Sequence, residues 1–323
     1  MATRFRYRTT MILAGAGAVA LGIGVLALGT ERVSAVPGRL VSAAASFAAP
    51  TTIEQVIARA KDGEVIELEA KDYGEILIKG HTWAKPVTIR AQPGTHGTLK
   101  IVKSQGVNVT GGDFGHIEKG YAMHVHLSKN VNISDVSLTA APRGLVISRS
   151  QNVSVSKARI TEMRIDGINV AASQHVTIVD SSCARFNTGK AHPDCIQLWS
   201  DPKRGGTTKD VTLLRNRSDG NMQGFTAFNH VRDGVDDGGF DRLVFRDNWV
   251  TGYYPNGVAV YDCRNCDISN NTAVTPPDAK WHVIVRAIRC TDCTVEGNVN
   301  GKRPSELRKA SVEVENTSAS ETR

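Results

Sequence analysis

A short sequence pattern returns along the chain at nearly constant spacing, and it constrains the fold more than any other feature. In its clearest copies, a serine is followed three and five residues later by Val or Ile: Ser104–Val109, Ser128–Ile133, Ser150–Val155 and Ser173–Ile178. These serines are 24, 22 and 23 residues apart. Later segments keep the alternation: Val211–Leu213, Leu243–Phe245, Cys266–Ile268 and Cys293–Val295. A period of roughly 20 to 50 residues is typical of solenoids and related repeat folds.

A second alternating segment precedes each copy and predicts another strand of the same coil, with one face buried and the other wet. No amphipathic helix separates the two segments, which excludes a βαβ sheet. The chain is therefore predicted to be all-β, a single-stranded right-handed parallel β-helix with a short N-terminal capping helix. Stacking would align one interior column: Met123, Leu145, Ile168, Ile196, Phe225 and Val258.

An independent column of turn residues supports this register. Five residues beyond the first inward residue of the later repeat copies (Val176, Val211, Leu243, Cys266 and Cys293), the sequence has Ser181, Asn216, Asn248, Asn271 and Asn298. Asparagine tolerates the left-handed turn conformation, and stacked amides can hydrogen-bond from coil to coil. Recurrence at one register predicts an asparagine ladder.

The start of the repeat region carries a predicted cap. Residues 52–60 have apolar side chains at helical spacing, and Thr52 stands at the start. Asp62-Gly63 and the strand-like segment Glu64–Leu68 follow, then Asp72-Tyr73-Gly74. This order resembles the N-terminal cap of the pectate-lyase-like superfamily, and with the repeats the resemblance covers roughly residues 50 to 300. It implies a β-helix of the kind that grips and often cleaves polysaccharides.

The N-terminal residues read as an export segment. Basic residues Arg4, Arg6 and Arg8 precede an uncharged run, Met11–Gly29, and the small-residue sequence Val33-Ser34-Ala35. Residues 1–35 are thus expected to be a signal peptide, or alternatively an uncleaved membrane anchor. Residues 36–50 are expected to be a linker, 51–303 the β-helix domain, and 304–323 a disordered polar tail. Either way the protein is expected outside the cytoplasm, in the periplasm, in the extracellular space or anchored to a membrane.

The net charge constrains the partner only loosely. The formal net charge of +7 is compatible with an anionic substrate. Lys and Arg are scattered and no recognised nucleic-acid module is present, so nucleic acid is not expected as a partner.

The sequence has six cysteines, and four of them form two C-x-x-C pairs on neighbouring coils: Cys263, Cys266, Cys290 and Cys293. Adjacent parallel strands bring stacked residues about 4.8 Å apart, which a disulfide accepts. In an oxidising compartment, cross-coil disulfides are favoured over buried free thiols and over a zinc site. The remaining two, Cys183 and Cys195, are also candidates for pairing.

Aligning the strands that precede the serines places polar and aromatic side chains on one outer face. Asp166 and Asp194 begin neighbouring strands, with His192 nearby. The expected substrate-binding residues are amides, aromatic rings and a cation: Asn169, Gln197, Trp199, His124, His126, Arg143, Phe228 and Tyr261. Aromatic rings stack on sugar faces and amides bind hydroxyl groups, so this face predicts a polysaccharide site.

Two local motifs resemble those of polygalacturonase-type glycoside hydrolases. Asp166-Gly-Ile is followed on the next coil by Pro193-Asp194-Cys195-Ile196, where that family has Asp-Asp-Cys-Ile. The resemblance makes Asp166 and Asp194 two of three catalytic aspartates. Pro193 replaces the general acid and Gln223 replaces the family's histidine, so His192 is considered as the acid.

The same residues are also compatible with β-elimination and with binding without cleavage. In β-elimination from a uronic acid, the candidate bases are His192, Arg143 and Lys190, and Asp166 with Asp194 could hold Ca²⁺. A non-catalytic glycan-binding surface or scaffold protein is the alternative function. The Gly- and Asp-rich segment 233–239 lacks EF-hand spacing and predicts a rim loop.

Overall fold

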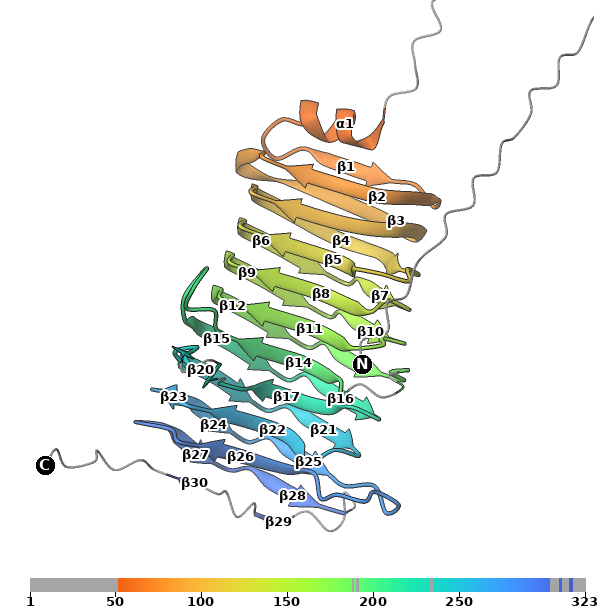
Figure 1. The fold of residues 1–323 in the computed structure, drawn as a ribbon. Coiled ribbons are helices and arrows are strands. Elements are labelled where there is room, and N and C mark those ends of the chain that lie inside the picture. Colours follow the sequence, from red (N-terminus) through yellow and green to blue (C-terminus); the bar gives the residue numbers. More distant parts are fainter. Residues whose placement is uncertain are drawn as a thin grey trace, which may run out of the picture. The chain divides into compact units, whose positions relative to one another are not determined.

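The chain folds as a parallel β-solenoid of about 10 turns, with one short helix at its N-terminal end (Figure 1). The structure is a computed structural model that describes residues 52–187, 189, 192–229, 231–232, 235–302, 308–309 and 314–315. The expected export segment and linker lie outside these residues. Among the described residues, no helix is long and apolar enough to cross a membrane.

Successive turns stack their strands into three parallel ladders. The first ladder contains β5 (Tyr121–His126), β8 (Arg143–Ser148), β11 (Asp166–Ala171), β14 (Asp194–Trp199), β17 (Gln223–Ala227), β22 (Asn256–Tyr261) and β26 (Ile284–Ile288). The second contains β6 (Lys129–Ser134), β9 (Gln151–Ser156), β12 (Gln174–Val179), β15 (Thr208–Leu214), β20 (Phe240–Arg246), β24 (Asp267–Ser269) and β27 (Thr294–Glu296). The third contains β7 (Ser137–Thr139), β10 (Arg159–Thr161), β13 (Ser182–Ala184), β16 (Arg217–Gly220), β21 (Trp249–Gly252), β25 (Thr272–Val274) and β28 (Val299–Gly301).

The remaining elements lie at the two ends of the solenoid or in loops between its strands. At the N-terminal end lie α1 (Ile53–Arg59), β1 (Val65–Leu68), β2 (Asp72–Lys79), β3 (Thr82–Val102) and β4 (Gln105–Gly115), of which β3 and β4 contribute to more than one ladder. Later come β18 (Val231–Arg232), β19 (Val235–Asp236), β23 (Cys263–Arg264), β29 (Arg308–Lys309) and β30 (Val314–Glu315). The expected rim loop includes β19, which pairs antiparallel with β18. The four residues of β29 and β30 pair with β28 and β26, and the other residues of the expected tail, 304–323, lie outside the described residues.

The predicted interior column is confirmed residue by residue. Met123 pairs with Leu145, Leu145 with Ile168, and the register continues through Ile196, Phe225 and Val258. All six side chains are at most 1% exposed. Burying a large apolar side chain contributes about 1.5 to 3 kcal/mol, so a slip of one residue, which would turn this column to solvent, is strongly disfavoured.

The asparagine ladder is also confirmed, with one change in its explanation. Each amide accepts the backbone N–H of the preceding coil: Asn248 Oδ1 accepts from Asn216 (2.9 Å) and Asn271 Oδ1 from Asn248 (3.1 Å). The ladder asparagines are not themselves left-handed. The residue before each one has the positive φ, as at Asp247 (56°) and Asn270 (55°).

A matching serine ladder explains the first residue of the repeat. The backbone N–H of Ser104 donates to Ser128 Oγ (3.2 Å), that of Ser128 to Ser150 Oγ (3.1 Å), and that of Ser150 to Ser173 Oγ (3.1 Å). Each buried serine thus satisfies a backbone donor of the preceding coil at the corner before the second ladder.

The capping helix forms as predicted. Thr52 Oγ1 accepts from the backbone N–H of Gln55, and the Gln55 side chain accepts from the backbone N–H of Thr52, which is a complete capping box. Ile57 is fully buried and anchors the helix over the open end of the core.

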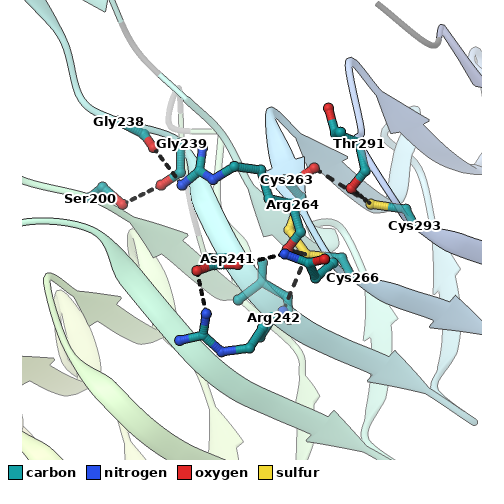
Figure 2. The surroundings of a disulfide bond; sticks show 12 residues. Ser200, Gly238, Gly239, Asp241, Arg242, Cys263, Arg264, Cys266, Thr291 and Cys293 are labelled. Carbon is teal, nitrogen blue, oxygen red and sulfur yellow. Dashed lines mark hydrogen bonds and ion pairs between the residues drawn. A yellow bond between two sulfur atoms is a disulfide. The ribbon is translucent and has the colours of Figure 1, made fainter.

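The cysteines pair differently from the main expectation. Cys183 and Cys195 form a disulfide, as considered from the sequence. The expected cross-coil pairing of the C-x-x-C motifs is wrong, because Cys263 bonds to Cys266 in the same coil (Figure 2). Cys290 and Cys293 are free thiols. Cys263 and Cys266 are both buried at the same corner of the coil. Cys263 can therefore reach Cys266 within its own coil as well as a cysteine of the next coil.

The two free thiols are expected to differ in reactivity. A hydrogen bond with Cys290, followed by backbone hydrogen bonds, lowers the pKa of Cys293 to about 7, while the pKa of Cys290 is raised by the same contact and by burial. Because the thiolate is the nucleophile, iodoacetamide at pH 7 should label Cys293 well before Cys290. Peptide mass spectrometry of briefly labelled protein measures this order, and faster labelling of Cys290 would contradict the assigned environments.

Candidate functional site

Asp166 and Asp194 lie side by side at the starts of β11 and β14. The two coils approach so closely here that a Cβ on Gly167 would lie 2.5 Å from the carbonyl oxygen of Cys195. This close approach therefore requires glycine at position 167. The backbone N–H of Asp194 donates to Asp166 Oδ1 at 3.1 Å, which fixes the two carboxyl groups relative to each other.

The Asp166 carboxylate has cationic and amide partners. Asn169 Nδ2 donates to its Oδ2 at 3.2 Å, and Arg143 Nε lies 3.5 Å from the same oxygen. Arg143 comes from β8 of the preceding coil, in register with Asp166. The side chain of Asn169 also reaches Gln197 Oε1 (3.4 Å), which connects this carboxylate to the next coil.

The Asp194 carboxyl has only neutral hydrogen-bond donors as partners among the described residues. Gln197 Nε2 donates to its Oδ2 at 3.1 Å, and Thr226 Oγ1 donates to its Oδ1 at 2.7 Å. Thr226 lies on β17, so the network spans four coils, from Arg143 to Thr226.

Burial and mutual repulsion separate the two carboxyl groups in acidity. Burial raises the pKa of Asp194 well above its ordinary value, and the negative charge of Asp166 raises it further. Burial also raises the pKa of Asp166, but the Asp194 backbone N–H, Asn169 and Arg143 oppose that rise. A carboxyl pair of this kind holds one proton more readily than two isolated groups, and the environments place it on Asp194.

The side chains of Asp166 and Asp194 are more deeply buried than the open outer face predicted from the sequence would make them. Asp166 is 5% exposed and Asp194 1% exposed. The neighbouring outward positions Asn169 and Thr226 are also buried, whereas Gln197 is partly exposed. The carboxyl groups thus lie among other buried polar side chains rather than on an open surface.

Calcium does not fit this pair well. All four carboxyl oxygens already accept hydrogen bonds or an ion pair, and the groups aimed at them are N–H and O–H donors. Ca²⁺ needs six to eight oxygen ligands. The donor set favours a proton on the pair over a calcium ion between its members.

The two predicted histidines lie together on β5, next to Ser148 of β8. His124 Nε2 is 3.1 Å and His126 Nδ1 2.8 Å from Ser148 Oγ. Burial lowers the pKa of His124 to about 4, with the neighbouring His126 and Lys100 adding to the effect. His124 is therefore a neutral hydrogen-bonding group at pH 7.

A basic pocket opens beside these histidines, at the ends of the first-ladder strands. It encloses about 430 Å³, and its lining includes Lys129, Arg149 and Arg204. Burial lowers the pKa of His126, and the positive charges of Arg149 and Lys103 lower it further. The field here favours an anionic ligand.

The remaining predicted site residues are spread along the face. Phe228 and Tyr261 form a tilted ring pair with centroids 5.0 Å apart, and Trp199 is 38% exposed. His192 is exposed and lies against Tyr254, 5.7 Å between ring centroids. Among the described residues it makes no hydrogen bond or ion pair with Asp166 or Asp194. Lys190, a candidate base, lies outside the described residues.

Several contributing residues had no distinct sequence signal. Thr226 and Ser148 occupy outward positions of predicted strands, but nothing in their residue type indicates the bonds to Asp194 and the histidines. Gln223 pairs in register with Asp194, and its side chain accepts a hydrogen bond from Asn256 Nδ2. Register alone places Gln223 beside Asp194.

Known proteins resemble this chain in fold, at low sequence identity. No protein-family model and no curated protein matches the chain. Among solved structures it is similar to PfbA, a surface adhesin of Streptococcus pneumoniae, with 9% identity, a TM-score of 0.50, and coverage of 73% of this chain and 66% of PfbA. It is also similar to DFA-IIIase from Arthrobacter chlorophenolicus A6 in complex with GF2, with 10% identity, a TM-score of 0.50, and coverage of 73% and 64%. The matches thus span just under two thirds of both proteins, and the chain shares with them a parallel β-solenoid.

Proposed function

We propose that this chain is an exported protein that binds an acidic, uronate-containing polysaccharide along its first ladder and cleaves it by hydrolysis. The observation that carries the proposal is the adjacent pair Asp166 and Asp194, whose environments separate their acidities. Asp194 is assigned as the general acid and Asp166, beside Arg143, as the general base.

Hydrolysis agrees with the pair better than β-elimination does. Glycoside hydrolysis needs one carboxyl that holds a proton at working pH and one that is ionised. The pKa of Asp194 is raised well above its ordinary value, which favours the protonated form, while Asn169 and Arg143 oppose the rise at Asp166 and favour its ionised form. For elimination, the candidate base Arg143 is already paired with Asp166, and His192 contacts Tyr254 instead of the carboxyl groups.

The charge around the face supports an acidic substrate. Lys129, Arg149 and Arg204 line the pocket beyond the histidines, and Lys100 and Lys103 act on the histidines themselves. Uronate carboxylates would meet cations here, while sugar rings would stack on Trp199 and the Phe228–Tyr261 pair.

Export is supported by the disulfide between Cys183 and Cys195, since structural disulfides persist in oxidising compartments. The export segment expected at residues 1–35 agrees with this location. A periplasmic, extracellular or anchored protein would meet polysaccharide there.

A second candidate function is glycan binding without cleavage. The observation that favours it is the near-complete burial of Asp166 and Asp194 with every oxygen engaged, which is typical of a structural network. The fold does not separate the two candidates, because it is shared by an adhesin and by DFA-IIIase.

One experiment separates these functions. The protein is incubated with polygalacturonate, alginate and neutral polysaccharides, while reducing ends, the absorbance of unsaturated sugars and binding are measured. Hydrolysis predicts new reducing ends without unsaturated products. Unsaturated products would mean elimination, binding alone would mean the second candidate, and neither binding nor cleavage of any acidic polymer would refute the proposal.

Arg149 provides a sharper test of the basic pocket. Replacing Arg149 with Gln should weaken binding of an acidic polysaccharide about two- to fivefold at low salt, because one partly screened cation is lost. Arg215→Gln is the matched control, since both arginines have left-handed backbones, with φ of 49° and 52°. Calorimetric titration measures both, and equal losses would show that net charge matters rather than this pocket.

A further inference from the structure

A second cluster of chemically active side chains lies away from the carboxyl pair, near the N-terminal end. His96 is on β3, Asp113 is on β4, and His116 follows β4 by one residue. His96 and Asp113 are paired in register on neighbouring coils. The solenoid thus brings together residues 20 apart in sequence.

The ligand atoms of these side chains converge. His116 Nε2 is 3.2 Å and His96 Nδ1 3.9 Å from the same carboxylate oxygen, Asp113 Oδ2. All three ligand atoms lie within 4.8 Å of one another. A tetrahedral Zn²⁺ with bonds of about 2.0 to 2.2 Å holds its ligand atoms roughly 3.3 to 3.6 Å apart, so the cluster needs only small shifts to accept one.

The surroundings orient the cluster as a metal site requires. Thr139 Oγ1 donates to the other oxygen, Asp113 Oδ1, at 2.8 Å, which leaves Oδ2 directed at the histidines. Such an outer hydrogen bond is the usual support of a ligating carboxylate. His96 Nδ1 is buried and has no hydrogen-bond partner among the described residues. An ion would give this nitrogen a partner.

We propose that His96, Asp113 and His116 bind a divalent transition-metal ion, with Zn²⁺ as the best match to two imidazoles and one carboxylate. Three protein ligands leave one position for water. The ion would join the coils of β3 and β4 close to the capping helix. This site is independent of the proposed polysaccharide chemistry.

The test is calorimetric titration of the whole protein with Zn²⁺, with His116→Asn as the main variant. Asparagine tolerates the left-handed backbone of His116 (φ 54°). Removing one of three ligands should weaken binding at least about tenfold, since losing even an outer partner costs about 10- to 100-fold. Thr139→Val should lower affinity by a similar factor without removing a ligand.

The matched control is His175→Asn. His175 has the same backbone conformation (φ 52°), a similar exposure, and one carboxylate nearby, Asp210 at 3.8 Å. Among the described residues, it is not part of a group of three potential metal ligands. Its variant should bind Zn²⁺ like the wild type. Cys293→Ala should do the same, which removes Cys293, the free thiol with the lowered pKa, as the source of the signal.

The outcomes decide the proposal in each case. One Zn²⁺ per chain, lost in His116→Asn and kept in both controls, supports it. No binding by the wild type, unchanged binding in His116→Asn, or loss in Cys293→Ala would overturn it. Circular dichroism melting without metal verifies that each variant folds, and only the wild type and the controls should gain thermal stability when Zn²⁺ is added.

Discussion

Replacing Asp194 with Asn is expected to lower the rate of polysaccharide cleavage by about 10²- to 10⁴-fold, the usual contribution of a general acid. Burial and the charge of Asp166 raise the pKa of Asp194 and so favour its protonated form. Asn resembles the protonated carboxyl in shape but cannot donate that proton to a leaving group. Initial rates of reducing-end release measure the loss. Binding of the polysaccharide, measured separately, should remain.

Stability provides a second readout of the same variant. The pKa of Asp194 is higher in the folded than in the unfolded chain, so its contribution to stability is full below the unfolded pKa and is lost as pH rises through the folded pKa. Asp194→Asn removes this dependence. The free energy of unfolding of the variant should therefore rise relative to wild type as pH increases.

Asp180→Asn is the control for both measurements. Asp180 is exposed and held by Arg215, which lowers the pKa of its carboxyl. This variant should keep full activity, and relative to wild type its stability should fall as pH rises above the low folded pKa, which is the opposite sign. Full activity in Asp194→Asn would remove Asp194 from the mechanism as the general acid.

The sequence predicted the register of the solenoid because buried and exposed side chains alternate with period two. Once Met123 and Leu145 are aligned, the pleat places every outward side chain, including Asp166 and Asp194. The adjacency of the two carboxyl groups followed from this alone.

Burial and cysteine pairing could not be predicted in the same way. The burial of Asp166 and Asp194 depends on side chains and turns from several coils. The alternation of residues along one strand gives no information about these. The pairing of Cys263 with Cys266 depends on a corner that turns residues three apart toward each other, and stacking distance alone favoured the neighbouring coil. The cluster of His96, Asp113 and His116 lies where β3 and β4 enter the third ladder and at the turn that follows it, a part of the coil that the sequence pattern did not describe.

The largest effect on stability is expected in the asparagine ladder, from Asn248→Leu. Asn248 Oδ1 accepts from the backbone N–H of Asn216, and its Nδ2 donates to the Leu213 carbonyl and to Asn271 Oδ1. Leucine has a similar volume but removes all of these bonds at a site that is 1% exposed. Each buried group left unsatisfied costs about 1 to 3 kcal/mol, so the variant should lose about 3 to 5 kcal/mol.

Asn132→Leu is the matched control, because it removes a similar cross-coil amide bond in water. Asn132 Nδ2 donates to Asn108 Oδ1 at 2.8 Å, but the residue is exposed, so water can replace the lost partner. Its free energy of unfolding should change by less than about 0.5 kcal/mol. Urea unfolding followed by circular dichroism compares the two. Equal losses would mean that the ladder stabilises the solenoid through strand packing and not through its buried amides, whereas the predicted difference assigns that role to the hydrogen bonds from coil to coil.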